Sequence, residues 1–337
     1  MASEVLARTI AVVGPTASGK TALALALAKR LGGEIVSADM GQMYRLLDAG
    51  TAKPAGSWDG GVYRVEGVPY HLVDALDPAE PTDAGRFAEL ARPVLDGITG
   101  RGRPGIVAGG TGLYVRSLIE GLDPLPRRDA AVRARIERRA EAGPEGRRSL
   151  HRELARRDPA AAKAIPAANL RRVVRALEVI ELTGRPISEQ WTLRAGRRTA
   201  SAGSAPVYLG IRWENEALKR RIRGRAEEMF PLMIKEVAAL IDSRYTGDEP
   251  GFRCLGYPEA VACARGELSA ERGLERMVKS TVAYAKRQRT WFRRQTPAHW
   301  LEGGMDQESL VAEALNAWAP RARASGAEAL RIAAWKK

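Results

Sequence analysis

The sequence predicts an α/β protein: a parallel sheet with helices on both faces, together with a mostly helical insertion domain. Residues 8–120 alternate short apolar runs with helical patterns, as in a doubly wound parallel sheet. Residues 123–204 are basic, helical and poor in strands. Strand character returns at Ala205–Trp213, which indicates that the sheet resumes after an insertion.

These changes divide the chain into four parts. We expect a first part of the α/β core over residues 1–122 and the basic helical insertion over 123–204. The core then returns with C-terminal helices over 205–300, and a helix with a basic tail fills 301–337. No internal repeat is found in the sequence.

The core elements follow from periodicity and from turn residues. β-branched and apolar runs predict strands at Thr9–Val13, Glu34–Val36, Tyr70–Asp74, Gly105–Ala108 and Ala205–Trp213. Helical spacing predicts helices at Gly19–Leu31, Phe87–Leu95, Leu113–Ile119, Asn169–Thr183, Glu214–Ile241, Glu275–Gln295 and from Gln307. A further helical segment starts near Cys254.

A glycine-rich turn between the first strand and the first helix fits G-x-x-x-x-G-K-[ST] at every fixed position, which predicts a P-loop NTPase-like core. Backbone N–H groups of such a loop, together with the positive end of the helix, bind phosphate oxygens. The lysine adds a charge, and the last threonine can hold Mg²⁺ on the phosphates. The alternative is a glycine turn that binds nothing. The expected diphosphate-binding residues are Gly14, Pro15, Thr16, Ala17, Ser18, Gly19, Lys20 and Thr21.

Acidic and amide side chains at neighbouring strand ends supply candidate chemistry. Ligands of parallel sheets bind at the carboxyl ends of the strands, where the P-loop, Asp39 and the turn Gly109–Gly112 should face one crevice. Asp39 is a candidate general base, or alternatively an N-cap. Gln42 is suited equally to reading a base edge or to completing a capping box. Arg225 on a later helix is a candidate for stabilising a leaving phosphate.

The charge of the chain favours a polyanionic partner. Lys and Arg number 54 against 40 Asp and Glu, giving +14 and a pI near 10.1. Residues 127–175 hold 15 Lys or Arg against 6 Asp or Glu. Tyr284, Trp291 and Phe292 alternate with cations, a pattern suited to RNA. The alternatives are an arginine-rich proteome, solvated helix faces and aromatics that belong to the core.

The two cysteines, Cys254 and Cys263, are too few for a disulfide framework or a zinc site, so a reducing cytoplasm is expected. The first eight residues hold no apolar segment typical of a signal peptide, and no run is long enough to span a bilayer. We therefore expect a cytoplasmic protein without a membrane partner, and we expect a monomer.

Taken together, these segments resemble the tRNA dimethylallyltransferases (tRNA isopentenyltransferases), from the P-loop to about Gln295. The specific motifs are Gly50-Thr51-Ala52-Lys53-Pro54 and Ala285-Lys286-Arg287-Gln288-x-Thr290-Trp291-Phe292. The resemblance also uses Ser37-Ala38-Asp39, Gly109–Tyr114 and Arg175–Val179.

The resemblance implies transfer of a dimethylallyl group from dimethylallyl diphosphate to N6 of adenosine 37 of tRNA, with Mg²⁺ as the cofactor. It implies catalytic roles for Asp39, Thr16 and Arg225, and a metal contact from Thr21. A strand-end Asp for ATP hydrolysis is not needed, which agrees with Gly109-Gly110 after the strand at Gly105–Ala108. The implied contacts to the tRNA anticodon stem-loop are Asp39, Met40, Gly41, Gln42, Thr111, Arg133, Arg171, Arg172, Val173, Val174, Arg175, Lys286 and Arg287.

The chain departs from the family pattern at several places, among them Val282-Ala283, where Arg-Gln is usual and where one tRNA contact is affected. Met40-Gly41 replaces the usual Ser-Met, so Gly41 is expected to loosen the loop that holds Asp39, and residues 55–68 are longer than usual. Three rival functions remain at this stage: a P-loop kinase of a small metabolite, an isopentenyltransferase of free AMP or ADP, and an RNA-binding protein with a P-loop switch.

Overall fold

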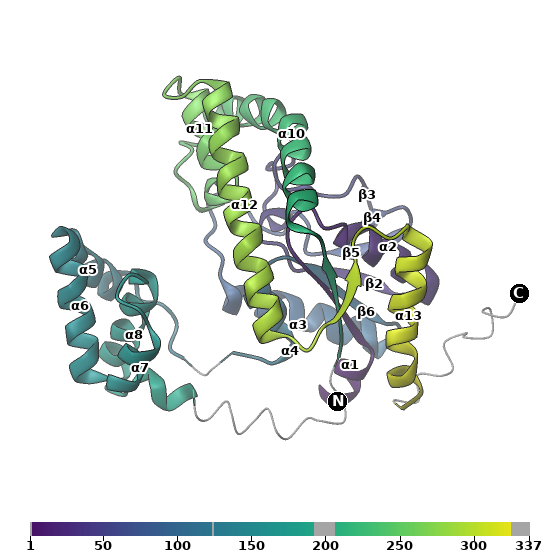
Figure 1. Ribbon diagram of the computed structural model, residues 1–337, viewed down its shortest axis with the longest axis horizontal. Coiled ribbons are helices and arrows are strands. Elements are labelled where there is room, and N and C mark those ends of the chain that lie inside the picture. Colours follow the sequence, from purple (N-terminus) through teal and green to yellow (C-terminus); the bar gives the residue numbers. More distant parts are fainter. Residues whose placement is uncertain (1, 123–124, 192–205, 325–337) are drawn as a thin grey trace, which may run out of the picture. The chain divides into compact units, whose positions relative to one another are not determined.

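The computed structural model describes residues 2–122, 125–191 and 206–324, and its centre is an eight-stranded sheet (Figure 1). The strand order is β3-β4-β5-β2-β6-β1-β7-β8. Neighbouring strands from β5 to β8 run parallel, whereas β3 and β4 pair antiparallel at one edge, so the predicted parallel α/β core is confirmed. The strands are β1 Thr9–Val13, β2 Glu34–Ser37, β3 Ser57–Asp59, β4 Val62–Val65, β5 Val68–His71, β6 Gly105–Gly109, β7 Val207–Arg212 and β8 His299–Glu302.

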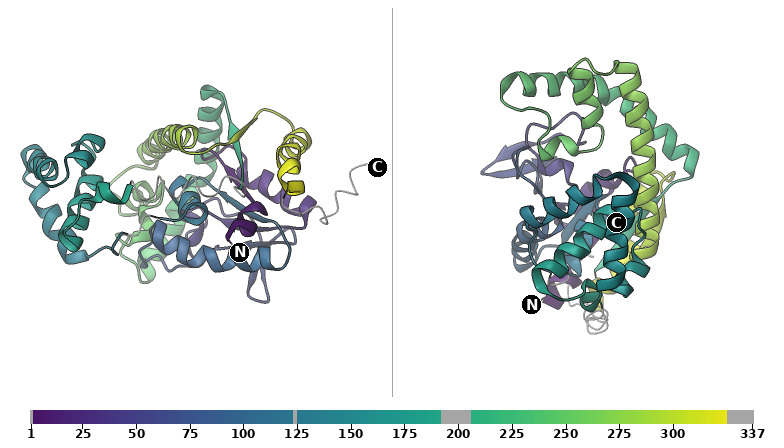
Figure 2. Two further views of the ribbon diagram at one scale, coloured as in Figure 1. Left: turned by 90° about the horizontal axis from the view of Figure 1, so that it is seen from below. Right: turned by 90° about the vertical axis from the view of Figure 1, so that its left-hand side faces the viewer.

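Helices cover both faces of this sheet because alternate strand residues point to opposite sides. In β1, Ile10 and Val12 pack with residues of α2 and α13, whereas Ala11 and Val13 belong to the core under α3 and α4. The helices α10, α11 and α12 pack against one another beside the sheet (Figures 1 and 2). The described α-helices outside residues 120–202 are α1 Ala2–Ala7, α2 Lys20–Leu31, α3 Ala84–Gly100, α4 Gly112–Ile119, α10 Asn215–Ser243, α11 Tyr257–Ala264, α12 Ala270–Gln295 and α13 Gln307–Ala324. None of the helices in the described ranges combines the length and the apolar character needed to cross a membrane.

The contacts divide the chain into two compact units. The α/β unit comprises Met1–Ile119 and Gly203–Lys337, and the helical unit comprises Glu120–Ala202, where the sequence placed an insertion at 123–204. In the helical unit, α5 Ala130–Ala140, α6 Gly143–Arg157, α7 Pro159–Ala164 and α8 Leu170–Thr183 enclose their own apolar core. These helices are drawn in teal in Figure 2.

The structure corrects the sequence prediction around residues 55–74. The strand expected at Tyr70–Asp74 begins and ends earlier, as Val68–His71, because Leu72 and Asp74 have left-handed φ angles of 62° and 54° that interrupt an extended chain. The long segment before it forms the hairpin β3–β4, which periodicity did not indicate. The short elements α1 and β8 were also missed, since four to six residues carry too little pattern.

Candidate active site

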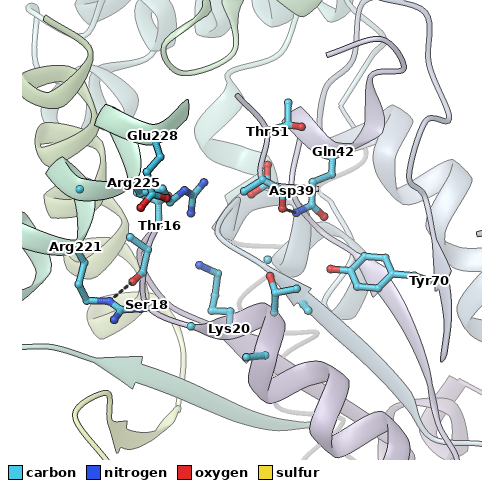
Figure 3. A pocket seen from close by; sticks show the side chains of 18 residues that line it. Thr16, Ser18, Lys20, Asp39, Gln42, Thr51, Tyr70, Arg221, Arg225 and Glu228 are labelled. Carbon is cyan, nitrogen blue, oxygen red and sulfur yellow. Dashed lines mark hydrogen bonds between the residues drawn. The ribbon is translucent and has the colours of Figure 1, made fainter. Parts of the chain in front are cut away.

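The carboxyl ends of several strands and one face of α10 enclose a cavity of about 590 Å³ in the α/β unit (Figure 3). The P-loop follows β1, Asp39 follows β2, and Gly109 ends β6, so the expected convergence at one crevice is found for these three. The P-loop residues that line the cavity are Thr16, Ala17, Ser18, Gly19, Lys20 and Thr21. Gly14 and Pro15 are buried beneath them.

The P-loop has the backbone of an anion site. Helix α2 begins after Gly19, which has a φ of 94° and no side-chain cap, so the first N–H groups of the helix are available to a ligand. A Cβ on Gly14 would lie 2.9 Å from the Ile211 carbonyl, so only glycine fits there. The Ser18 hydroxyl is buried and has no hydrogen-bond partner among the described residues. A phosphate oxygen in the loop fits this arrangement.

Three charged groups face one another across the cavity (Figure 3). Burial raises the pKa of Asp39, although Lys20, a hydrogen bond from Gly41 N and Arg225 each oppose the increase. Burial lowers the pKa of Lys20 to about 8; Asp39 works against this decrease and Arg225 adds to it. Burial also lowers the pKa of Arg225. Together with Arg221 and Glu228, three cations and two carboxylates line the cavity, which leaves positive charge for an anionic substrate.

Asp39 is oriented by its own loop. Its Oδ1 accepts a hydrogen bond from Gly41 N at 3.0 Å, which is the local capping bond that the sequence offered as the alternative role. Within the described residues this is the only hydrogen bond to the carboxylate, so Oδ2 stays available to a substrate. A Cβ on Gly41 would lie 3.0 Å from Thr51 Cγ2, so Gly41 packs closely rather than leaving the loop loose.

Gln42 lines the same cavity, but its amide is already engaged. Its Oε1 accepts a hydrogen bond from the Ser37 hydroxyl at 2.7 Å, and its Nε2 donates to the Ala52 carbonyl at 3.1 Å. The side chain is 5% exposed. Gln42 therefore holds the segment around Ala52 in place. Its amide completes no capping box, and it has no free group with which to read a base edge.

Four further polar or charged side chains that were not among the predicted site residues line the cavity: Thr51, Tyr70, Arg221 and Glu228. Arg221 and Glu228 lie four residues before and three after Arg225 on α10, and this helical spacing could have identified them. Tyr70 carried no such signal: the sequence placed it in a strand, but nothing in its local pattern indicated that it faces the cavity. Burial and Asp39 raise the pKa of Tyr70, whereas a hydrogen bond with Thr21 lowers it.

Helix α12 packs against the glycine turn after β6. Gln288 accepts a hydrogen bond from Thr16 N at 2.8 Å and donates to the Gly110 carbonyl at 2.8 Å. A Cβ on Gly112 would lie 2.3 Å from the Trp291 ring. Gly110 and Gly112 therefore serve the close approach of a helix rather than the phosphates.

The predicted RNA contacts in this region have different environments. Lys286 and Arg287 are exposed, and Arg287 lies 5.6 Å from the centre of the Tyr284 ring. Tyr284 is hydrogen-bonded with Thr111, and burial raises its pKa to about 12. Phe292 is fully buried, so the expectation that its ring stacks on RNA is wrong and the core alternative holds for it.

The predicted tRNA contacts on α8 of the helical unit are partly exposed and partly buried. Arg171 and Arg172 are exposed on α8. Val173 and Val174 have no exposed surface, so the predicted contact of these two residues with RNA is wrong: they belong to the apolar face of an amphipathic helix, which repeats every three to four residues and packs on the core of the unit.

Two of the predicted arginines in this unit converge on one buried carboxylate. Arg175 Nη1 lies 3.0 Å and Arg133 Nη1 3.7 Å from Glu178 Oε2. Glu178 has no exposed surface, and its other oxygen accepts a hydrogen bond from Asp129 N at 2.9 Å. Both arginines therefore compensate the charge of this buried carboxylate, whatever else they bind.

A metal ion would have few protein ligands at this site. In the described ranges, no three His, Cys, Asp or Glu side chains are grouped as a metal site. The Thr21 hydroxyl at the start of α2 lines the cavity next to Lys20. One protein oxygen with phosphate oxygens and water is a ligand set that suits Mg²⁺, so the residues present fit this ion.

The comparisons with known proteins agree on one family. Residues 42–295 match the family described as IPP transferase, and residues 7–65 match the one described as isopentenyl transferase. A tRNA dimethylallyltransferase of Elusimicrobium minutum is 44% identical over 306 residues, covering 90% of this chain and 98% of that protein. One from Anaeromyxobacter dehalogenans is 44% identical over 316 residues, covering 94% of this chain and 100% of that protein.

A solved structure gives the same result. The full-length tRNA isopentenylpyrophosphate transferase of Bacillus halodurans has a TM-score of 0.66 and is 34% identical, covering 94% of this chain and 97% of that chain. The family match covers more than half of the chain, and relatives that are 44% identical span most of it. This chain therefore belongs to the IPP transferase family of tRNA dimethylallyltransferases.

Proposed function

We propose that the enzyme transfers the dimethylallyl group of dimethylallyl diphosphate to N6 of adenosine 37 in the tRNA anticodon stem-loop. The observation that carries this proposal is a cavity that holds an anion-binding loop, the buried cations Lys20 and Arg225, and the Asp39 carboxylate with a free oxygen. Such a cavity binds a diphosphate at one side and can accept a proton from a nucleophile at the other.

The residues divide the reaction between them. Loop N–H groups, Lys20 and Arg225 bind the diphosphate and stabilise its charge as the bond between C1 and oxygen breaks. Adenine N6 forms the new bond to C1 and loses a proton, which Asp39 Oδ2 accepts. Mg²⁺, when bound by Thr21 and phosphate oxygens, would neutralise charge on the leaving group. Products are the prenylated adenosine and diphosphate.

The nucleophile needs this assistance because the lone pair of adenine N6 is delocalised into the ring. The base must also leave the stack of the stem-loop to enter the cavity, as in other base-modifying enzymes. We propose that Thr111, Lys286 and Arg287 of the α/β unit contact the RNA near the site. Arg133, Arg171, Arg172 and Arg175 of the helical unit would contact its phosphates.

The alternatives find less support in the site. A kinase of the P-loop type uses an acidic residue at the end of a core strand to hold Mg²⁺. Here β6 ends in Ala108-Gly109, and Gly110 packs against Gln288. An isopentenyltransferase of free AMP needs no exposed arginine surface. We also propose action in the cytoplasm, where the free thiols of Cys254 and Cys263 are stable.

The test is a transfer assay with labelled dimethylallyl diphosphate, Mg²⁺ and an anticodon stem-loop that carries adenosines at 36 to 38. We expect label in the RNA and none when adenosine 37 is replaced by guanosine. AMP is included as a competitor. Labelling of AMP as fast as of the stem-loop would overturn the RNA assignment, and phosphoryl transfer from ATP to a metabolite would overturn prenyl transfer.

A further inference from the structure

Three consecutive residues of the P-loop are held by side chains from distant parts of the chain. The Thr16 N–H donates to Gln288 Oε1 at 2.8 Å. The Ala17 carbonyl accepts a hydrogen bond from Arg221 Nε at 2.9 Å, and the Ser18 carbonyl accepts one from Trp213 Nε1 at 3.0 Å. The Arg221 guanidinium also lies 4.4 Å from the centre of the Trp213 ring, so these two donors form one packed pair (Figure 3 shows Arg221 bonded to the loop).

These bonds determine where the loop amides point. In a trans peptide the carbonyl and the following N–H point in opposite directions, and the described backbone has no cis peptide. Arg221 lines the cavity itself, so its bond holds the Ala17–Ser18 peptide at the edge of the cavity. Trp213 is not among the residues that line the cavity, so the Ser18–Gly19 peptide, with its carbonyl turned to Trp213, directs the Gly19 N–H to the cavity side.

The Pro15–Thr16 peptide has the opposite orientation to the Ser18–Gly19 peptide. The Pro15 carbonyl accepts a hydrogen bond from Lys20 Nζ at 2.6 Å, while the Thr16 N–H of the same peptide points to Gln288. Ala17, whose φ is 62°, lies between the two peptides. A left-handed backbone costs free energy in a residue other than glycine and persists only when its surroundings hold it.

The neighbouring loop is shaped to admit the indole. A Cβ on Gly303 would lie 2.0 Å from Trp213 Nε1, so a side chain there would push the indole away from the Ser18 carbonyl. A Cβ on the adjacent Gly304 would meet nothing within 4 Å. The space at Gly303 is therefore specific to the hydrogen bond of Trp213.

We propose that Trp213, supported by Arg221 and by the space at Gly303, is a positioning residue of the diphosphate site. It directs the Gly19 N–H of the loop at the phosphates and holds the left-handed turn at Ala17. The inference rests on diphosphate binding at this loop, as in the proposed function, and it concerns affinity for the donor rather than contact with RNA.

The test uses the full chain, with inorganic diphosphate and dimethylallyl diphosphate as probes in titration calorimetry. Trp213→Phe keeps the ring over which Arg221 lies but removes the N–H donor, and Gly303→Ala displaces the indole without changing it. We expect each to weaken binding of both probes about 3- to 10-fold, the effect of one lost hydrogen bond, with affinity for the stem-loop unchanged.

Two matched controls distinguish positioning from general destabilisation. Trp318 is buried, and its Nε1 has no partner among the described residues, so Trp318→Phe removes an N–H that orients nothing. Gly304→Ala adds the same methyl group one residue away. Both should bind the probes within about twofold of the parent, a change worth about 0.4 kcal/mol. Equal losses in Trp213→Phe and Trp318→Phe would overturn the proposal.

A spectroscopic signal completes the test. In protein with ¹⁵N-labelled tryptophan, the indole N–H resonance of Trp213 is identified as the one that disappears in Trp213→Phe. This resonance should shift when inorganic diphosphate is added. It should also have a different chemical shift in Gly303→Ala. The Trp318 resonance should do neither. An unmoved Trp213 resonance, or unchanged affinity in both variants, contradicts the inference. Failure of transfer to RNA with these binding effects intact would reject the proposed reaction and leave the positioning role.

Discussion

The cavity of the α/β unit and the surface of the helical unit are both rich in cations. The two regions differ in how the positive charges are paired with carboxylates and how far they are exposed to water. In the cavity, Lys20 and Arg225 share Asp39, and burial lowers the pKa of both cations. In the helical unit, surface arginines such as Arg139 and Arg148 pair with Glu153 and Glu145 in contact with water. Desolvated charge is weakly screened and acts strongly on a bound anion, whereas solvated pairs contribute little each.

The difference separates two kinds of function. Substitutions in the cavity should change chemistry or donor binding, and substitutions of exposed arginines should change RNA affinity in a salt-dependent manner. A cavity variant that changes only RNA affinity, or a surface variant that changes only turnover, would contradict this division.

The largest effect is expected at Asp39. Asp39→Asn keeps an oxygen for the Gly41 amide but cannot accept a proton, so single-turnover transfer at saturating stem-loop should slow by about 10²–10⁴. RNA affinity should stay within about threefold. Asp59→Asn, on the exposed hairpin, is the control and should react normally. A loss of affinity with normal turnover would make Asp39 structural.

The next effect is expected at the buried carboxylate of the helical unit. Glu178→Ala leaves Arg133 and Arg175 without their common partner, so the unit should lose about 3–5 kcal/mol of stability. Because two units need not unfold together, hydrogen exchange of the α8 amides is the appropriate measurement. Glu145→Ala removes an exposed pair and should change exchange little. Equal exchange in the two variants would contradict the assignment.

A pH dependence follows from Lys20, whose pKa is about 8 in the free protein. A bound diphosphate favours the charged lysine and raises this pKa. Affinity should therefore be constant below about pH 8 and fall up to tenfold per unit above it, with proton uptake on binding. Calorimetry in buffers of different ionisation enthalpy measures both.

Lys20→Arg is the matched variant for this profile. Arginine stays charged throughout the range, so its affinity should be independent of pH between about pH 7 and 9.5. A flat profile for the parent protein would show that Lys20 does not carry the charge that binds the donor.

The smallest effect per residue is expected on the surface of α8. Arg171→Ala and Arg172→Ala should each weaken stem-loop binding modestly and lower the slope of log K against log salt by about 1. Turnover at saturating stem-loop should not change. Arg148→Ala, an exposed arginine already paired with Glu145, is the control. An unchanged salt slope would mean that α8 is only a solvated surface.

Much of the fold and part of the site could be predicted from local pattern. The strand at Thr9–Val13, the P-loop and α2 follow from adjacent residues, because glycine spacing and helical periodicity are short-range properties. Asp39 was predictable as a strand-end carboxylate. Val173 and Val174 were misassigned, and the two alternatives for Phe292 stayed open, because charge around a residue does not reveal which face of its helix packs inward.

The sequence by itself determined which groups this protein has for chemistry: a phosphate loop, a strand-end carboxylate and helices rich in arginine. Only the tertiary structure decided how they are held. Trp213 reaches the Ser18 carbonyl across 195 residues and Gln288 reaches Thr16 across 272, and no local pattern encodes such pairs. A hydrogen bond requires its donor and acceptor to lie within about 3 Å, whatever their distance in the sequence. Only the packing of whole helices and strands brings these side chains to the loop.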